Sequence, residues 1–289
     1  PTGTGLIYCA KRHPKRFHDV GIAEEHAAIF AAGMATQGMK PFLAIYSTFM
    51  QRAYDMIIHD IALQNLNVAL CMDRAGLSGD DGPTHHGLFD IAYLRPVPGL
   101  IQMQPKDEAE FVDMLWTIAH HEGPAAIRYP RGSGTGASID HKPRLLEIGK
   151  SEVLRHGTDA AIFALGNMCE LALPAAEALE KQGISTAVIN ARWIKPLDTT
   201  TLEFFAGGCN VICTMEDHVL HNGFGSAVIE HLSDRGLTTP VVRIGWPDQF
   251  IEHGTVPILR QKHGLTVEAT VKKIRDSLAG VTSNAVNVV

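Results

Sequence analysis

Asn67-Val-Ala-Leu-Cys-Met72 is a short, almost wholly apolar run that two charged residues, Asp73 and Arg74, end abruptly. A run of this kind is typical of a strand that is buried on both faces of a parallel sheet. Similar runs lie at residues 17–22, 41–46, 100–104 and 125–129, and longer amphipathic stretches separate them. The alternation predicts βα units around a mostly parallel sheet.

Three of the intervening stretches are expected to be helices. Residues 23–37 are rich in alanine and end at Gly38, a residue that commonly follows the last turn of a helix. Residues 49–64 and 107–121 carry apolar side chains at spacings of three and four. These three segments are predicted to be crossover helices, and residues 1–5 a loop.

Residues 131–146 combine glycine, serine and charged residues with few apolar ones, a composition typical of linkers. The βα pattern then resumes, with strands expected at residues 160–165, 185–190, 210–215 and 241–244, a last helix at 267–278 and a loose tail at 280–289. We therefore predict two successive three-layer α/β domains with mostly parallel sheets, at residues 1–135 and 151–289, with a linker at 136–150.

Composition narrows the class of partner and of compartment. The formal net charge of -6 argues against nucleic acid as the main partner. The five cysteines are scattered without CxxC pairs, which favours a reducing compartment. No apolar run reaches the roughly 20 residues that a membrane-spanning helix needs. A soluble protein is expected.

Ligands of open α/β sheets bind beyond the carboxyl ends of the strands, and those positions are unusually polar in the first domain. Glu24 and Glu25 follow the first predicted strand, Arg52 lies just after the second, and Arg131 follows the last. Taken alone, the two glutamates could simply complement a helix dipole, and the arginines could be surface charges.

The loop from Ser78 to Gly87 has two possible functions. Its side chains include four possible metal ligands, which are Asp80, Asp81, His85 and His86. Adjacent residues of an extended loop point apart, however, and the spacing matches no known zinc pattern. A loop that gives hydrogen bonds and proton transfers to a small polar substrate is the preferred hypothesis.

The second domain has fewer candidates. Gly223-Phe-Gly-Ser226 could open a helix and hold a phosphate, although a short GxG is a weak signal. His218 and His221 are expected to be surface histidines. Cys209 and Cys213 are expected to be buried as small apolar side chains.

Several segments together resemble the 1-deoxy-D-xylulose-5-phosphate synthases, a family of transketolase-like thiamin diphosphate enzymes. They are Asp19-Val-Gly-Ile-Ala-Glu-Glu-His26, residues 45–55, His59-Asp60, Asp73-Arg-Ala-Gly76, Asp81-Gly-Pro-Thr-His85, Arg128-Tyr-Pro-Arg-Gly132, residues 192–198 and Ile244-Gly-Trp-Pro-Asp248. The resemblance covers nearly the whole chain. Glu25, where many relatives have glutamine, and His86 are small departures from the family pattern.

The resemblance implies which domains of the enzyme this chain contains. Members of the family carry a diphosphate-binding domain, a pyrimidine-binding domain and a C-terminal domain, and this chain resembles the last two. The GDG-type motif that holds magnesium and the diphosphate is absent from the sequence. We therefore expect thiamin diphosphate as the cofactor, with Mg²⁺ and the diphosphate held by a separate N-terminal half and no metal ligands in this chain. The assembled enzyme is expected to be cytoplasmic and homodimeric, and to act on pyruvate and D-glyceraldehyde 3-phosphate.

The same resemblance assigns site residues. Glu24 would hydrogen-bond the aminopyrimidine ring of the cofactor and Phe49 would stack on it, with Tyr46 and Arg52 close by. His85 joins Glu24 as a catalytic candidate. The substrate positions would be Tyr46, Arg52, Arg74, Asp81, His85 and Arg131, among which Arg74 and Arg131 suit the acceptor phosphate, because a guanidinium offers a planar fork of donors.

Two alternatives differ in class. The first is the beta subunit of a 2-oxo acid dehydrogenase's decarboxylating component, which has the same two domains but needs no arginine pair for a phosphorylated acceptor. The second is a non-catalytic transketolase-like subunit. Such a subunit should have lost Glu24 or the arginines, and this chain has kept them.

Overall fold

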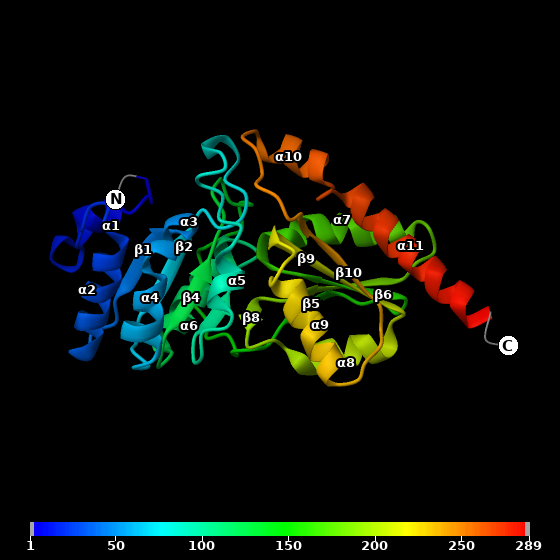
Figure 1. Ribbon diagram of the computed structural model, residues 1–289, viewed down its shortest axis with the longest axis horizontal. Helices are drawn as coiled ribbons and strands as arrows, with labels where there is room; N and C mark the ends of the chain where they lie inside the picture. The colour runs from blue at the N-terminus through cyan, green and yellow to red at the C-terminus, as the bar shows by residue number, and fades with distance from the viewer. Residues whose placement is uncertain (1–2, 287–289) are drawn as a thin grey trace.

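The computed structural model describes residues 3–286, which form two α/β lobes that lie side by side (Figure 1). Each lobe contains a five-stranded sheet, ordered β1-β2-β4-β3-β8 in the first and β10-β9-β6-β7-β5 in the second. All neighbours pair in parallel except β8 on β3 and β5 on β7. The prediction of mostly parallel sheets is confirmed.

The elements of the first lobe follow the apolar runs of the sequence. Its strands are β1 (Phe42–Tyr46), β2 (Ala69–Asp73), β3 (Ile101–Met103) and β4 (Ala125–Arg128), and its helices are α1 (Ile7–Arg12), η1 (Pro14–Arg16), α2 (Glu24–Thr36), α3 (Ser47–Met50), η2 (Gln51–Ala53), α4 (Tyr54–Met56), the π-helical η3 (Ile57–Ala62), η4 (Gly79–Asp81), α5 (Asp90–Leu94) and α6 (Glu108–His120). Leu70 and Met72 of β2 pack with α2 and η3, while Ala69 and Cys71 pack with α6 on the other face. Alternate side chains thus enter opposite layers.

The second lobe is built in the same way. It contains β5 (Glu152–Arg155), β6 (Ala160–Ala164), β7 (Thr186–Asn190), β9 (Val211–Val219), β10 (Val241–Trp246), η5 (Gly166–Met168), α7 (Cys169–Glu180), α8 (Thr199–Gly208), α9 (Phe224–Asp234), α10 (Val256–His263) and α11 (Val267–Val286). The short strand β8 (Trp193–Lys195) belongs to this part of the sequence but joins the first sheet. Ile162 of β6 faces the layer of α7 and α11, and Phe163 faces the layer of α8 and α9.

Three predicted elements are wrong. Residues 17–22 are not a strand, because Asp19 Oδ1 accepts the Gly21 N–H (3.0 Å) and Gly21 has a φ of +71°, which turns the chain before any pairing begins. The helix predicted at 49–64 is divided into α3, η2, α4 and η3. The last helix continues to Val286, so a loose tail from 280 is wrong up to that residue; residues 287–289 and the first two residues of the predicted opening loop lie outside the described residues.

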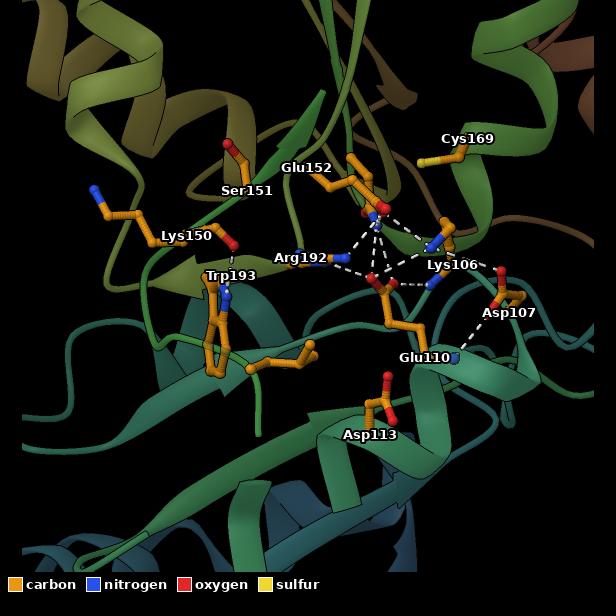
Figure 2. A network of polar contacts seen from close by, with 12 residues as sticks. Lys106, Asp107, Glu110, Asp113, Lys150, Ser151, Glu152, Cys169, Arg192 and Trp193 are labelled. Atoms are coloured by element: carbon orange, nitrogen blue, oxygen red, sulfur yellow. Dashed lines mark hydrogen bonds and ion pairs between the residues drawn. The ribbon is translucent and has the colours of Figure 1, made fainter. Parts of the chain in front are cut away.

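The two lobes share a strand and a polar network. Gln102 and Met103 of β3 pair with Lys195 and Trp193 of β8, so a segment C-terminal to the linker completes the first sheet. Figure 2 shows Glu110 of α6 held by the second lobe, with Arg192 Nε at 2.5 Å. Asn190 Nδ2 also donates to both Glu110 oxygens, at 2.9 and 3.0 Å. These contacts fix the lobes against each other.

Candidate active site

The carboxyl ends of β1, β2 and β4 lie at one edge of the first sheet, and the chain segments that follow them carry most of the predicted side chains. The structure joins all eight predicted residues into one continuous set of contacts, which are Glu24, Tyr46, Phe49, Arg52, Arg74, Asp81, His85 and Arg131. We call this set the edge cluster. It has an acidic and a basic group at each end and aromatic rings between them.

One end of the edge cluster is an ion pair between Glu24 and Arg52. Glu24 is the first residue of α2 and is only 9% exposed, because the turn of the helix holds it against the residues after β1. Arg52 Nη1 donates to both Glu24 oxygens, each at 3.2 Å. The Arg52 guanidinium also lies 5.1 Å from the Phe49 ring centre, which is a cation–π distance.

The middle of the edge cluster is aromatic. The Tyr46 and Phe49 rings stack with centroids 5.9 Å apart, and the His85 ring meets Phe49 edge-on at 5.3 Å. His85 Nδ1 also lies 2.9 Å from the hydroxyl oxygen of Thr84. These rings form the polarisable surface on which a flat heterocycle could rest.

The other end is a carboxylate between two guanidiniums. Arg74 has a φ of +58°, directs Nη1 to Asp81 and donates from Nη2 to the Tyr46 hydroxyl at 2.7 Å. Arg131 Nε lies 3.4 Å from the same Asp81 oxygen, and its Nη1 donates to the Ser78 carbonyl at 3.4 Å. The Arg74 side chain is 15% exposed and the Arg131 side chain 43%, so Arg131 is the more available of the two.

One hydrogen-bond donor of Arg74, its Nε–H, is unused within the described residues. Among residues 3–286, its buried Nε has no hydrogen-bond partner. A buried donor without a partner is costly unless a ligand completes it. Asp81 is thus shared by two guanidiniums, and the Nε–H of Arg74 remains available for an anion.

The four possible metal ligands of the loop 78–87 do not converge. Asp81 pairs with arginines, and Asp80 is exposed. His86 is buried, accepts the Ser78 N–H at Nδ1 (3.2 Å) and lies with Nε2 3.2 Å from the Glu252 carbonyl. In the part of the chain that the structure describes, no three His, Cys, Asp or Glu side chains are grouped as metal ligands.

In the second lobe, the helix start at Gly223 is already occupied by a protein carboxylate. Glu216 accepts the N–H groups of Phe224 (2.6 Å) and Gly225 (2.9 Å), so the phosphate hypothesis for this turn is wrong. Burial raises the pKa of Glu216 to about 7. His218, expected at the surface, is fully buried instead, and its Nδ1 donates to the Val219 carbonyl at 2.7 Å.

The remaining second-lobe predictions are confirmed. The His221 side chain is 64% exposed, while Cys209 and Cys213 are buried.

Asp217 was missed as a residue that supports the site. Its Oδ1 accepts the N–H of Leu77 at 3.2 Å and the indole N–H of Trp246 at 2.7 Å. Gly76 has a φ of +81°, and a Cβ there would lie 2.5 Å from the Asp217 carboxyl group, so the loop needs glycine at this point. The available signal was the polar triplet Glu216-Asp217-His218 directly after the apolar run at residues 210–215.

Comparisons with known proteins identify the two domains. Residues 1–135 match the transketolase pyrimidine binding domain, and residues 149–270 match the transketolase C-terminal domain. The chain is 60% identical to 1-deoxy-D-xylulose-5-phosphate synthase of Methylacidiphilum infernorum over 94% of its own length and 43% of that protein. It is 57% identical to the synthase of Acidobacterium capsulatum over 95% of its length and 44% of that protein. The chain thus spans less than half of these curated relatives.

Solved structures extend the likeness. A chain described as a split gene transketolase, inactive beta4 tetramer, has a TM-score of 0.85 and 34% identity, covering 93% of this chain and 86% of that one. Transketolase from Campylobacter jejuni shares the fold, with a TM-score of 0.70 at 18% identity over 89% of this chain and 39% of that one. The chain therefore belongs to the transketolase family, of which it carries the pyrimidine-binding and C-terminal domains, and within these domains it is similar to the 1-deoxy-D-xylulose-5-phosphate synthases.

Proposed function

We propose that this chain forms half of the active site of a 1-deoxy-D-xylulose-5-phosphate synthase. In that reaction pyruvate loses carbon dioxide, and its remaining two-carbon unit joins D-glyceraldehyde 3-phosphate. The observation that carries the proposal is the edge cluster, because a buried carboxylate, stacked rings and paired guanidiniums lie together in a chain up to 60% identical to such synthases. The relatives reported above give no support to a dehydrogenase beta subunit.

The residues at the Glu24 end fit an aminopyrimidine ring. A carboxyl group that is 9% exposed and fixed on the first turn of α2 can hydrogen-bond a ring nitrogen, and Phe49 offers an aromatic face beside it. When bound, thiamin diphosphate supplies the electron sink that stabilises a carbanion. The chain's own task at this end would be to hold the ring and to share one proton with it through Glu24.

Arg52 affects how Glu24 can do this. Its guanidinium neutralises the carboxylate and, by bonding both oxygens, fixes the orientation of the carboxyl group. The Arg52 side chain is 49% exposed and so has room to swing away as a ring enters. We therefore place Arg52 as the partner of Glu24, while its role as a substrate ligand stays a prediction.

The residues at the Asp81 end fit the phosphorylated acceptor. Arg131 and the unpartnered Nε of Arg74 would donate to phosphate oxygens. Asp81 holds both guanidiniums in place, and the Tyr46 hydroxyl, already bonded to Arg74, stiffens the same group. His85 lies between the two ends, where its imidazole could move a proton on the joined substrates.

The proposal requires a second half. The curated relatives are more than twice as long as the part that this chain matches, and we propose that the remainder binds the diphosphate and Mg²⁺. The second half could be the rest of one polypeptide or a separate subunit, as in the split gene transketolase that resembles this chain. A homodimeric, cytoplasmic enzyme is part of the same proposal. No helix of the described residues is long and apolar enough to cross a membrane.

Reconstitution tests the proposal. The 289-residue chain, shown to be free of companions by intact-mass measurement, is assayed for deoxyxylulose phosphate alone and after mixing with the N-terminal half of a close synthase relative. Product is expected only from the mixture. Product from the isolated chain would contradict the need for a second half, and no product from a mixture that forms a stable complex would contradict the synthase function.

A further inference from the structure

The loop 78–87, which carries Asp81 and His85, rests against the second lobe. In Figure 1 it is the cyan loop that rises between the lobes beside the orange segment leading into α10. His86 stands at this contact and is only 2% exposed. Its Nδ1 accepts the Ser78 N–H within the loop, and its Nε2 reaches the Glu252 carbonyl in the second lobe, each at 3.2 Å.

These two bonds define the state of the ring. Because Nδ1 accepts a backbone N–H, the single proton of a neutral imidazole must lie on Nε2, where it is donated to the Glu252 carbonyl. One neutral tautomer therefore satisfies both the loop and the second lobe. A protonated ring would carry a proton on Nδ1 as well and would face the Ser78 N–H with another donor.

Other contacts show that the second lobe shapes this loop. The ring of His253 lies with Nε2 2.8 Å from the Asp80 carbonyl. Gly79 lies so near Val256 that a Cβ would come within 3.0 Å of its side chain. His86 differs from these neighbours because it bonds the loop to itself and to the second lobe at once.

We propose that His86 is a positioning residue, whose neutral Nε2-protonated ring locks the loop bearing Asp81 and His85 onto the second lobe and thereby shapes the acceptor site. The catalytic part of this inference rests on the proposed function, whereas the locking of the loop does not. The second lobe then contributes to acceptor binding without touching the acceptor. No contact of His86 with substrate is required.

Charge around the ring gives the lock a pH dependence. The groups that face His86 are Asp217 from β9, Asp81 from η4 and His253 from the segment before α10. The two carboxylates favour the protonated ring and His253 opposes it, but burial is the largest effect and lowers the pKa of His86 below its ordinary value. The lock is therefore closed at neutral pH and should open as the pH falls through that lowered value.

Three substitutions at this position separate the two bonds. His86→Asn keeps an acceptor near the place of Nδ1 and loses the bond to Glu252. His86→Gln keeps a donor near the place of Nε2 and loses the bond to Ser78. His86→Ala loses both, and His221→Ala, at an exposed histidine of the second lobe, is the matched control.

The readout is hydrogen–deuterium exchange of residues 77–87 in the whole chain, corrected for intrinsic rates and compared with the helix α6. Each lost bond should speed exchange about fivefold, and the alanine variant should exceed either single loss. Wild-type exchange in the loop should rise further as pH falls, and none of the three variants should show this added rise. Should the alanine variant fail to fold, the asparagine and glutamine variants decide the question.

Unchanged loop exchange in both the asparagine and glutamine variants would overturn the proposal, as would a pH dependence that persists in them. In the assembled enzyme, His86→Asn should raise KM for glyceraldehyde 3-phosphate more than KM for pyruvate, and equal effects would overturn the acceptor role. If the assembled wild-type enzyme makes no product while the loop exchanges as expected, the proposed synthase function is wrong. The locking of the loop by His86 would still hold.

Discussion

Replacement of Arg131 by alanine should separate phosphate recognition from folding. The guanidinium is 43% exposed and makes contacts of 3.4 Å with Asp81 and Ser78, both near the upper limit for such interactions. A half-exposed ion pair of this length contributes roughly 0 to 1 kcal/mol to the free energy of unfolding, because water and salt screen it. Arg131→Ala should therefore fold with little change in stability.

Acceptor binding should respond much more strongly. A charged hydrogen bond to a bound phosphate contributes roughly 1.5–3 kcal/mol, which corresponds to a factor of about ten to a hundred in kcat/KM. The exposure of Arg131 favours the lower half of that range. We expect about a tenfold to thirtyfold loss for glyceraldehyde 3-phosphate and an almost unchanged KM for pyruvate.

Arg74→Ala provides an informative contrast. Arg74 is 15% exposed and bonds both Asp81 and the Tyr46 hydroxyl, so its removal takes a partner from the Tyr46 hydroxyl and leaves Asp81 with the longer contact to Arg131 alone. That variant should lose stability as well as acceptor binding, by roughly 1–3 kcal/mol. The difference between the two variants follows from their burial.

The decisive assay compares two acceptors in the assembled enzyme. Initial rates with glyceraldehyde 3-phosphate and with unphosphorylated glyceraldehyde give the preference for phosphate, and Arg131→Ala should reduce that preference. Arg275→Ala removes a guanidinium that is 54% exposed on α11 and serves as the control for net charge. Equal losses for the two acceptors would show that Arg131 does not recognise phosphate and would refute the assignment.

Three further predictions concern buried charges. Glu24→Gln should slow product formation in the assembled enzyme by about 10² and leave the thermal midpoint within a few degrees of wild type. Glutamine keeps the size of the side chain and one acceptor but cannot share the proton. An unchanged rate would contradict this role. Arg128→Met should destabilise the chain in urea titrations by roughly 3–5 kcal/mol, because it leaves the buried Asp90 carboxylate without its partner; the two side chains pair at 2.8 Å and are both fully buried. Adding Asp90→Asn should recover part of the lost stability. If the effects of the two substitutions simply add, the two residues are not coupled. Burial raises the pKa of Glu216 from 4.5 to about 7, so between these pH values the native state keeps a proton that the unfolded chain releases. The resulting contribution to the free energy of unfolding is complete below pH 4.5 and is lost as the pH rises to about 7. Urea titrations at pH 4.5 and pH 7 should therefore differ by on the order of 3 kcal/mol in the wild type, and Glu216→Gln should remove that difference.

The parallel strands could be predicted because their sequences leave little choice. Uninterrupted apolar runs such as the one at β2 can be satisfied only between two covering layers, and their lengths are those of strands. The topology then predicts that residues after β1, β2 and β4 share one edge. Most of the edge cluster follows from that single inference, although each of its residues alone has an ordinary explanation.

The errors arise where a segment's state depends on a distant partner. Residues 17–22 contain Phe17, Val20 and Ile22, but the turn at Gly21 leaves them without pairing. Residues 193–195 carry no strand signal that distinguishes them from a loop, and they pair because β3 offers an open edge. His218 looks polar in sequence and is buried because its ring bonds the Val219 carbonyl and the Ala92 N–H.

The pairing within the edge cluster has a consequence that the residue types alone could not give. Its charges divide into a pair, Glu24 with Arg52, and a group of three, Asp81 with Arg74 and Arg131. The stacked rings of Tyr46 and Phe49 lie between them. The Glu24 end is neutral overall, which suits an uncharged pyrimidine. The Asp81 end has two guanidiniums and one unused buried N–H, which suit an anion. On the proposed function, the cofactor's pyrimidine and the phosphorylated acceptor would thus be oriented along one aromatic surface, because each end of the site would select its own ligand by charge.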